Sequence, residues 1–426
     1  MNLVVNPTEN LKGEINAPPS KSYTHRAIIL ASLAEGKSKI TNPLLCADTL
    51  ASIDACKAMG AKIAIDKKNN CLNISGISMP ELPEKIIDVK NSGTTIRIMA
   101  SVLALCNEKV TITGDESIRN RPMQPLIEAL EQLGVKTEST EGLAPVSVTG
   151  PITGGKCQIR GDVSSQFISG LLIAAPLAKN DTTVEIIKSL KSTPYLKMTL
   201  HLIEMFGGEI ENRNYKKFYI NCGQKYTSAD YEIEGDYSSA AFIIGAAVLT
   251  NSEIKIKNLF RNSKQGDKMI LDILKTMGAD IVVEEDYITV KGNGKLKGIS
   301  VDLSQYPDLL PIVAILGSLA KGKTIIKNIE HIRYKECDRV HAIATELKKM
   351  GARVTELKAS LEIFGGDKLK GAKVSGWDDH RIVMALAVAG MRAEGETLID
   401  TAESIDISFP TFVEVMNEIG ANVELR

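Results

Sequence analysis

The chain of 426 residues is long enough for two domains with separate hydrophobic cores, since 44% of its residues are hydrophobic although only 4% are aromatic. Its 51 basic and 52 acidic residues almost cancel, which excludes the strongly basic surface that binding to nucleic acid or to an anionic membrane requires. Any site for an anion must therefore come from a local arrangement of charges.

The cysteine and histidine residues indicate neither disulfides nor a metal site. The seven cysteines are scattered without a C-x-x-C pair, and the five histidines show no i,i+4 pairing. This pattern predicts reduced thiols in the cytoplasm and no bound metal. We also expect no membrane helix, since no run approaches about 18 apolar residues, and no signal peptide, since residues 1–7 lack a basic head.

The first predicted elements are strands within residues 3–16, followed by a polar segment that opens a helix at residues 27–33. Lys21 and Arg26 stand at the start of this helix, where the helix dipole disfavours cations. Two interpretations remain open. The segment is either a solvated helix end or a site where the dipole and both cations bind an anion.

Residues 91–97 and 119–123 introduce the next two helices. Gly93 stands among small hydroxyl side chains and would let a ligand approach the backbone, although a plain capped helix explains the same pattern. Pro122 suits the first turn of the following helix, which would place Arg121 at the start of that helix.

A buried helix with a polar first turn is predicted at residues 167–175. Ser164, Ser165 and Gln166 precede this apolar run, and a Ser or Asp side chain there can cap the open N–H groups. The pattern recurs at Asp236, before the apolar run 242–249. Between these two helices, Ser192 precedes a further helix start that contains a proline.

The C-terminal part of the chain holds its densest group of charged residues. Asp308 is a lone acid at the start of an apolar helix, and residues 333–339 include Arg333, Lys335, Glu336, Asp338 and Arg339 before a helix at residues 342–350. A solvated helix start with ion pairs explains this segment as well as a functional site does. Asp379, His380 and Arg381 open the last helix of this kind.

A repeated marker divides the chain into six units. An apolar residue followed by glycine, with another apolar residue or cysteine four positions before that glycine, occurs every 69 to 74 residues, at Gly60, Gly134, Gly207, Gly278, Gly351 and Gly420. The spacing predicts one face of a helix that ends at a glycine cap. We expect each unit to contain two helices and several short strands.

Six units divide evenly into two domains of three. We place the chain crossings near residue 18 and within residues 231–235, which gives one domain at residues 18–232 and another formed by residues 1–17 and 233–426. If the helix starts of both domains face one cleft, their dipoles and arginines favour small anions. Asp308 and Glu336 would then be the proton-transfer pair.

These motifs resemble those of the 5-enolpyruvylshikimate-3-phosphate synthases, the 3-phosphoshikimate 1-carboxyvinyltransferases of the enolpyruvyl transferase family. The resemblance covers nearly the whole chain in the family's order. It rests on residues 19–22 with Arg26, residues 91–94 with Arg97, residues 121–122, residues 163–166, residues 333–339 and residues 378–381.

The resemblance implies an α/β fold, the two-domain inside-out α/β barrel, with six βαβαββ repeats and the active site in the cleft between the domains. It implies transfer of the enolpyruvyl group of phosphoenolpyruvate to the 5-hydroxyl of shikimate 3-phosphate, with release of phosphate. This reaction of the shikimate pathway leads to chorismate and aromatic amino acids. It needs no cofactor and no metal, and we expect a cytoplasmic monomer that glyphosate inhibits.

The resemblance also implies residue roles. Shikimate 3-phosphate would be held by Lys21, Ser22, Arg26, Ser164, Ser165, Gln166, Ser192, Asp308, His331 and Lys335. Phosphoenolpyruvate would be held by Lys21, Gly93, Arg121, Gln166, Arg339 and Arg381. Asp308 would take the proton of the attacking hydroxyl, while Glu336 and Lys21 would handle the proton at the methylene carbon and the leaving phosphate.

Two positions depart from the family pattern. Ile407 stands where many members have a lysine that helps to bind phosphoenolpyruvate. His331 stands where asparagine is frequent, and its protonation would affect binding near neutral pH.

Two alternatives remain. The sister enzyme, UDP-N-acetylglucosamine enolpyruvyl transferase, shares the fold, but its opening motif contains Lys-Asn where this chain has Lys21-Ser22, and its reactive loop cysteine has no clear counterpart here. A non-catalytic repeat scaffold would instead present a basic surface or exposed apolar grooves, and the balanced charge argues against it.

Overall fold

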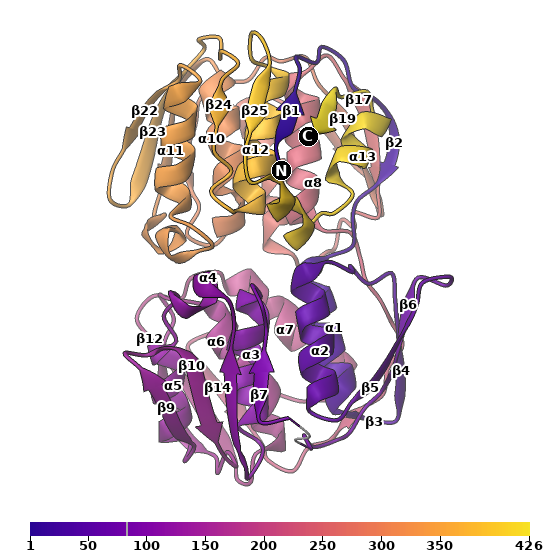
Figure 1. The fold of residues 1–426 in the computed structure, drawn as a ribbon, viewed down its shortest axis with the longest axis vertical. Coiled ribbons are helices and arrows are strands. Elements are labelled where there is room, and N and C mark those ends of the chain that lie inside the picture. Colours follow the sequence, from indigo (N-terminus) through magenta and orange to yellow (C-terminus); the bar gives the residue numbers. More distant parts are fainter. Residues whose placement is uncertain (82–83) are drawn as a thin grey trace. The chain divides into compact units, whose positions relative to one another are not determined.

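The computed structural model describes residues 1–81 and 84–426 (Figure 1). The chain divides into two compact units. The N-terminal unit is Pro19–Ile233, and the C-terminal unit is Met1–Pro18 together with Glu234–Arg426. No helix among the described residues is long and apolar enough to cross a membrane.

Each unit contains three mixed four-stranded sheets that share one strand pattern. An edge strand runs parallel to its neighbour, and the two following pairs are antiparallel, as in the sheet β7-β8-β10-β9. Helical segments follow the second strand of every repeat, and in four repeats they also follow the first strand. In the other two repeats the edge strands are exchanged along the chain: β2 (Lys12–Asn16) leads into α1 (Lys21–Leu33) but pairs with β17, and β16 (Tyr231–Glu232) leads into α8 (Tyr237–Leu249) but pairs with β4. The predicted α/β class and the six βαβαββ repeats are therefore confirmed.

The N-terminal unit contains the first three repeats. The first repeat consists of β16 (Tyr231–Glu232), α1 (Lys21–Leu33), β4 (Lys37–Thr41), α2 (Ala47–Ala58), β5 (Lys62–Asp66) and β6 (Cys71–Ser75). The second consists of β7 (Ile86–Asp88), α3 (Gly93–Leu103), β8 (Lys109–Thr113), α4 (Glu116–Arg119), α5 (Gln124–Gln132), β9 (Lys136–Thr140) and β10 (Leu143–Thr149). The third consists of β11 (Gly155–Arg160), α6 (Ser165–Ala174), η1 (Ala175–Leu177), β12 (Thr182–Ile187), α7 (Thr193–Met205), β13 (Glu211–Arg213) and β14 (Lys217–Ile220). A separate parallel pair is formed by β3 (Ala34–Glu35) and β15 (Tyr226–Thr227).

The C-terminal unit contains the other three repeats. The fourth consists of β2 (Lys12–Asn16), α8 (Tyr237–Leu249), β17 (Glu253–Lys257), η2 (Gly266–Lys268), α9 (Met269–Met277), β18 (Asp280–Val283) and β19 (Tyr287–Lys291). The fifth consists of β20 (Ser300–Asp302), η3 (Pro307–Leu309), α10 (Leu310–Leu319), β21 (Gly322–Lys327), η4 (Glu330–Tyr334), α11 (Arg339–Lys349), β22 (Arg353–Glu356) and β23 (Ser360–Gly365). The sixth consists of β24 (Lys373–Val374), α12 (His380–Met391), β25 (Thr397–Ile399), η5 (Ala402–Ile407), α13 (Phe412–Glu418), β26 (Val423–Leu425) and β1 (Leu3–Val5).

The N-terminal strands complete sheets whose other strands come from the C-terminal unit. Strand β1 lies between β25 and β26, with Val4 opposite Leu398 and Glu424. Strand β2 pairs in parallel with β17, with Ile15 opposite Ile256. The first strand region predicted at residues 3–16 is thus two strands in two different sheets.

The most apolar helices lie inside each unit and the sheets lie outside. Every residue of α8 and of α12 is buried, and these two helices pack against each other and against α10 (Figure 1). The strands instead alternate, as in β10, where Ala144, Val146 and Val148 are buried between more exposed residues. One face of each strand therefore covers the helical core.

The predicted glycine caps are confirmed at all six positions. Each glycine lies just past the end of a helix and has a positive φ, for example 99° at Gly278 after α9. This left-handed conformation favours glycine because a β-carbon there is strained. The repeat marker in the sequence is therefore the end of the second helix of each unit.

Three helix starts differ from the prediction. Helix α1 begins at Lys21 and α11 begins at Arg339, each several residues before the expected apolar start. Pro122 does not lie in a first turn, because the proline in the first turn of α5 is Pro125. Arg121 consequently lies in the segment between α4 and α5.

Candidate active site

The N-terminal unit contains nine of the predicted site residues, which we call the N-terminal cluster. Its members are Lys21, Ser22, Arg26, Gly93, Arg121, Ser164, Ser165, Gln166 and Ser192.

Gln166 is oriented by two contacts between α6 and α3. Arg97 Nη1 donates a hydrogen bond to Gln166 Oε1 at 2.7 Å, and Gln166 Nε2 donates to Thr94 Oγ1 at 2.8 Å. The helices approach closely there, since a β-carbon on Gly170 would lie 2.9 Å from the carbonyl oxygen of Arg97. The first turns of α3 and α6 are therefore joined.

Gly93 leaves space that the guanidinium of Arg121 occupies. A β-carbon on Gly93 would overlap Arg121 Nη1, and Nη2 of the same group donates a hydrogen bond to Ser117 Oγ at 3.3 Å. The cation of Arg121 thus lies at the first residue of α3, where the N-terminal end of the helix dipole also attracts anions.

Lys21 is paired with a carboxylate that the sequence analysis did not identify. Its Nζ lies 2.7 Å from Asp48 Oδ2, and both side chains are mostly buried. Burial alone would raise the pKa of Asp48, but the charge of Lys21 holds that pKa well below its ordinary value. Asp48 also lies in the first turn of α2, where an acid suits the helix dipole.

Arg26 is a buried cation surrounded by neutral oxygen atoms. Its Nε donates to Thr199 Oγ1 at 2.8 Å and its Nη1 to the carbonyl oxygen of Ser22 at 2.8 Å, while Ser169 Oγ lies 3.5 Å from Nη2. Burial lowers the pKa of this guanidinium to about 10. A nearby anion would offset the cost of burying this charge.

The serines of the N-terminal cluster lie at helix starts. Ser164 caps α6, with its Oγ accepting a hydrogen bond from Gln166 N at 3.2 Å, and Ser165 is the first residue of that helix. Ser192 precedes α7 in a left-handed conformation with φ of 56°. Hydroxyl groups and open N–H groups at these positions are suited to an oxyanion.

The C-terminal unit contains the other six predicted site residues, which we call the C-terminal cluster. Its members are Asp308, His331, Lys335, Glu336, Arg339 and Arg381.

Arg339 is the centre of the C-terminal cluster and is 1% exposed. Its guanidinium donates to Asp379 Oδ2 at 2.7 Å, to Asp308 Oδ1 at 2.9 Å and to Glu336 Oε2 at 2.6 Å. Burial alone would lower the pKa of Arg339, but these three carboxylates raise it well above the ordinary value. Arg339 therefore remains a cation.

Three cations converge on Asp308. Besides Arg339, Lys335 Nζ lies 3.4 Å from Asp308 Oδ1, and Arg381 Nη2 lies 3.3 Å from Oδ2. Asp379, which caps α12 through a 2.9 Å hydrogen bond from Arg381 N, joins the start of that helix to the same network. The two acids predicted to transfer protons, Asp308 and Glu336, are thus linked through Arg339.

Besides Asp48, the sequence analysis did not identify Asp267, an acid whose pKa is affected by the charge of Asp308. Asp267 lies in η2, is 3% exposed, and its Oδ2 accepts a hydrogen bond from Ser238 Oγ. Burial and the charge of Asp308 raise the pKa of Asp267 to about 6. Neither Asp48 nor Asp267 belongs to a motif that would have singled it out. Only their positions in the first turns of helices gave a signal.

The charged residues of segment 333–339 fall into two groups. One group forms ion pairs at the start of α11, and the other lies around Asp308. Arg333 Nη1 contacts Asp338 Oδ2 at 2.8 Å and Glu356 Oε1 at 2.7 Å, and Asp338 caps α11 through His341 N. For Arg333 and Asp338, the structure therefore agrees with the interpretation of a helix start with ion pairs. Lys335, Glu336 and Arg339 instead converge with Asp308.

The remaining residues of interest are His331 and Ile407. His331 lies in η4 and is 8% exposed. Ile407 ends η5 and is partly buried, next to buried Ser408 and Phe409. Among residues 1–81 and 84–426, no group of three or more His, Cys, Asp or Glu side chains could hold a metal ion.

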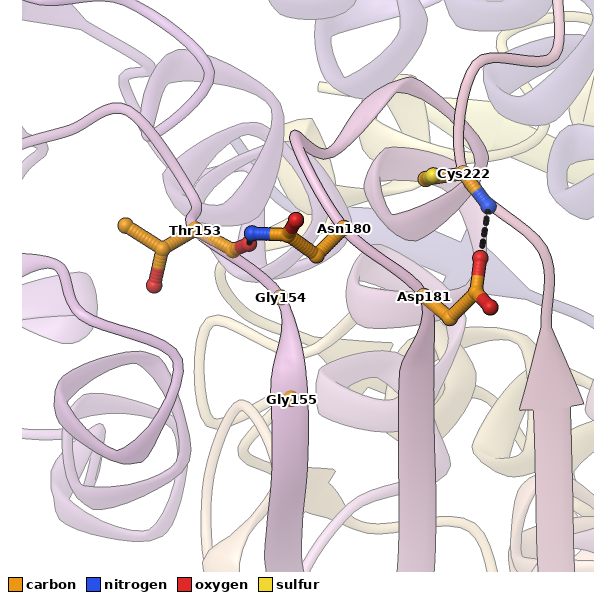
Figure 2. A pocket seen from close by; sticks show the side chains of 6 residues that line it. All are labelled: Thr153, Gly154, Gly155, Asn180, Asp181 and Cys222. Atoms are coloured by element: carbon orange, nitrogen blue, oxygen red, sulfur yellow. Dashed lines mark hydrogen bonds between the residues drawn. The ribbon is translucent and has the colours of Figure 1, made fainter.

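A pocket of about 390 Å³ on the N-terminal unit contains none of these residues (Figure 2). Asn180 Nδ2 donates to the carbonyl oxygen of Thr153 at 2.7 Å, and Cys222 N donates to Asp181 Oδ1 at 2.9 Å. Its lining is Thr153, Gly154, Gly155, Asn180, Asp181 and Cys222. The first bond joins the segments before β11 and β12, and the second joins the segment before β12 to the one after β14. The lining of the pocket lacks the cations that mark the two clusters.

Both clusters place arginine and lysine side chains at helix starts, in a protein whose overall charge is nearly neutral. The repeated βαβαββ fold and these cations define a class of two-unit α/β proteins suited to small, multiply charged anions.

Comparison with known proteins identifies the family. The family model for EPSP synthase (3-phosphoshikimate 1-carboxyvinyltransferase) matches residues 5–416. Proteins named 3-phosphoshikimate 1-carboxyvinyltransferase from Methanocaldococcus jannaschii and Methanococcus aeolicus are 50% and 49% identical to the whole chain, which spans 99% and 100% of their lengths. The chain therefore belongs to the EPSP synthase family.

A solved structure supports the same assignment. The EPSP synthase from Acinetobacter baumannii is similar with a TM-score of 0.85 and 29% identity, and the match covers 99% of each chain. The fold is thus the two-domain inside-out α/β fold of that family.

Proposed function

We propose that this protein transfers the enolpyruvyl group of phosphoenolpyruvate to the 5-hydroxyl of shikimate 3-phosphate and releases phosphate. The similarity over the full length to proteins named 3-phosphoshikimate 1-carboxyvinyltransferase carries this proposal. The two clusters support it because both substrates are small anions with carboxylate and phosphate groups.

Shikimate 3-phosphate is held mainly by hydroxyl groups and cations of the N-terminal cluster. Arg26 supports this role most directly, since the three hydrogen bonds of its buried guanidinium within the described part of the chain go to neutral oxygens. Further contacts come from Lys21, Ser22, Ser164, Ser165, Gln166, Ser192, Asp308, His331 and Lys335.

Phosphoenolpyruvate is held by cations from both clusters. Arg121 lies beside Gly93 at the start of α3, while Arg339 and Arg381 contact Asp308. Planar guanidinium groups bind carboxylate and phosphate through paired hydrogen bonds. Lys21 and Gln166 contact both substrates. The proposal therefore requires both clusters to act on one pair of substrates, as the predicted cleft between the domains would allow.

The reaction consists of an addition and an elimination. Asp308 takes the proton of the 5-hydroxyl while that oxygen bonds to carbon 2 of phosphoenolpyruvate, and Glu336 with Lys21 delivers a proton to carbon 3. Glu336 then takes a proton back from carbon 3 of the tetrahedral intermediate, and the bond from carbon 2 to the phosphate oxygen breaks with its electron pair on the leaving phosphate. Positioned cations stabilise the charge of the leaving phosphate.

The same proposal includes the cytoplasm as compartment and a monomer as the active form. All seven cysteines are free thiols, which suits a reducing compartment. One chain carries both clusters, so the mechanism needs no residue from a second copy.

The function is tested by phosphate release from phosphoenolpyruvate with two different acceptors. We expect release with shikimate 3-phosphate and none with UDP-N-acetylglucosamine. Release only with the nucleotide sugar would identify the sister activity instead, and release with neither acceptor would contradict the proposal.

A further inference from the structure

A row of polar side chains, buried or mostly buried, joins the first turns of α1, α2 and α3. Each of α1 and α2 contributes two residues four positions apart, which places them on one helix face. We call the row the α1–α3 relay, and its members are Lys21, His25, Asp48, Ser52, Ser92 and Thr95.

The distances along the relay are short except at one step. Asp48 Oδ2 lies 2.7 Å from Lys21 Nζ, whereas Asp48 Oδ1 lies 3.6 Å from His25 Nε2, longer than a hydrogen bond. His25 Nδ1 then lies 2.8 Å from Ser52 Oγ, which lies 2.7 Å from Thr95 Oγ1.

The relay ends at the first turn of α3. Ser92 Oγ lies 2.6 Å from Thr95 Oγ1 and accepts a hydrogen bond from Thr95 N at 3.2 Å, which caps the helix. Gly93, beside Arg121, directly follows Ser92. The relay thus spans from the ammonium group of Lys21 to the residues that surround Gly93.

We infer that His25 is a positioning residue that couples the Lys21–Asp48 pair to the start of α3 through Ser52 and Thr95. This inference rests on the proposed function, because Lys21 and Gly93 are there assigned to phosphoenolpyruvate. His25 itself is not assigned to either substrate.

The carboxylate of Asp48, 3.6 Å from Nε2, favours one form of the His25 ring, and the hydroxyl groups on the other side can adapt to it. With a proton on Nε2, the ring presents a donor to Asp48, and Nδ1 accepts from the Ser52 hydroxyl. Ser52 then accepts from Thr95, and Thr95 accepts from Ser92, so that each hydroxyl both donates and accepts once. A proton on Nδ1 would instead turn the Nε2 lone pair toward the carboxylate of Asp48.

The surroundings keep this ring neutral. His25 is fully buried, and burial lowers its pKa below the ordinary value, only partly opposed by Asp48. The charged groups that face it are Lys21 and Arg26 from α1 and Asp48 from α2, while α3 contributes only hydroxyl groups. The neutral ring therefore transmits a fixed direction of hydrogen bonds.

The tautomer is tested directly by long-range ¹H–¹⁵N NMR of the full chain with labelled histidine. Five histidines are present, and the spectrum of a His25→Gln variant assigns the resonances of His25. We expect a neutral Nε2–H ring at pH 7 to 8. An Nδ1–H ring or a charged ring would overturn the inference whether or not the protein has the proposed activity.

The coupling is tested by the kinetics of Ser52→Ala, Thr95→Val and the double variant. Each single change should raise the KM for phosphoenolpyruvate about tenfold, as loss of one buried hydrogen bond would, with kcat nearly unchanged. The KM of the double variant should equal that of either single variant, because both substitutions interrupt the same relay.

The matched control is Ser32→Ala, which removes a buried hydroxyl of α1 that donates to the carbonyl oxygen of Ile28 at 2.7 Å and is not a member of the relay. It should lower the melting temperature as much as Ser52→Ala does while KM stays unchanged. Equal KM values for all variants, or multiplied effects in the double variant, would overturn the inference. An inactive wild type would refute the proposed function and leave the NMR result to decide the relay.

Discussion

Arg339 Nη1 donates a 2.9 Å hydrogen bond to Asp308 Oδ1 while its Nε donates to Asp379 Oδ2 at 2.7 Å. This buried guanidinium thus fixes the acid proposed to deprotonate the acceptor and the acid that caps α12. Its planar shape is essential because several donors point to different carboxylates at once.

Arg339→Lys keeps the charge but removes this geometry. We expect kcat/KM for phosphoenolpyruvate to fall at least about 100-fold, because an ammonium group cannot replace the fork of donors. Steady-state kinetics measure the loss. The control is Arg353→Lys, whose exposed pair with Asp367 should contribute little. Equal losses in the two variants would contradict the special role of Arg339.

Asp267 gives the protein a measurable pH dependence of stability. Its pKa of about 6 in the folded protein exceeds the ordinary aspartate value of about 3.9. The folded state therefore holds more protons between these values, and its stability falls as pH rises from about 4 to 6.

Asp267→Asn should remove this decrease in stability with rising pH. We expect the free energy of unfolding of the variant, relative to wild type, to increase by on the order of 2 kcal/mol between pH 4 and pH 7. Urea denaturation at both pH values measures the difference. A difference that does not change with pH would show that Asp267 does not titrate in this range.

Gly93→Ala tests the space beside Arg121. The new β-carbon would displace the guanidinium, which can move because it ends a flexible side chain. We expect wild type to be inhibited by glyphosate, the variant to be inhibited more weakly, and its KM for phosphoenolpyruvate to rise. Inhibition curves for both proteins decide this, and equal glyphosate sensitivity would refute the steric explanation.

His331→Ala tests a residue that we propose contacts shikimate 3-phosphate. We expect a several-fold higher KM for shikimate 3-phosphate, since a buried hydrogen-bonding ring is removed. His341→Ala is the matched control, because that ring is 51% exposed and contacts Glu356. If KM is the same in wild type and in His331→Ala, His331 does not contact the substrate.

The repeats were predictable because local signals recur in every unit. Glycines after amphipathic helices, such as Gly278 and Gly351, need left-handed backbone whatever the tertiary context. The division of residues 3–16 between two sheets was not predictable, because strand pairing across the whole chain decides where β1 and β2 lie. Pro122 and Pro125 both fit a helix start, and local sequence could not separate them.

The candidate site was predictable where a side chain belonged to a motif. Lys335, Glu336 and Arg339 were recognised, and the structure brings them to Asp308. Asp48 and Asp267 were not recognised, because their roles depend on neighbours far away in sequence, Lys21 and Asp308. Sequence patterns predict where helices start. Which side chains at two helix starts contact each other can be seen only in the folded structure.

The assignment of Asp308 as the base is tested most directly by phosphate release with phosphoenolpyruvate and shikimate 3-phosphate in wild type and in Asp308→Ala. Removing a general base typically costs about 10²–10⁴-fold in rate, and we expect a loss at the upper end because Lys335, Arg339 and Arg381 also lose their shared carboxylate. A variant that is folded by circular dichroism, binds shikimate 3-phosphate and releases phosphate at the wild-type rate would contradict the account.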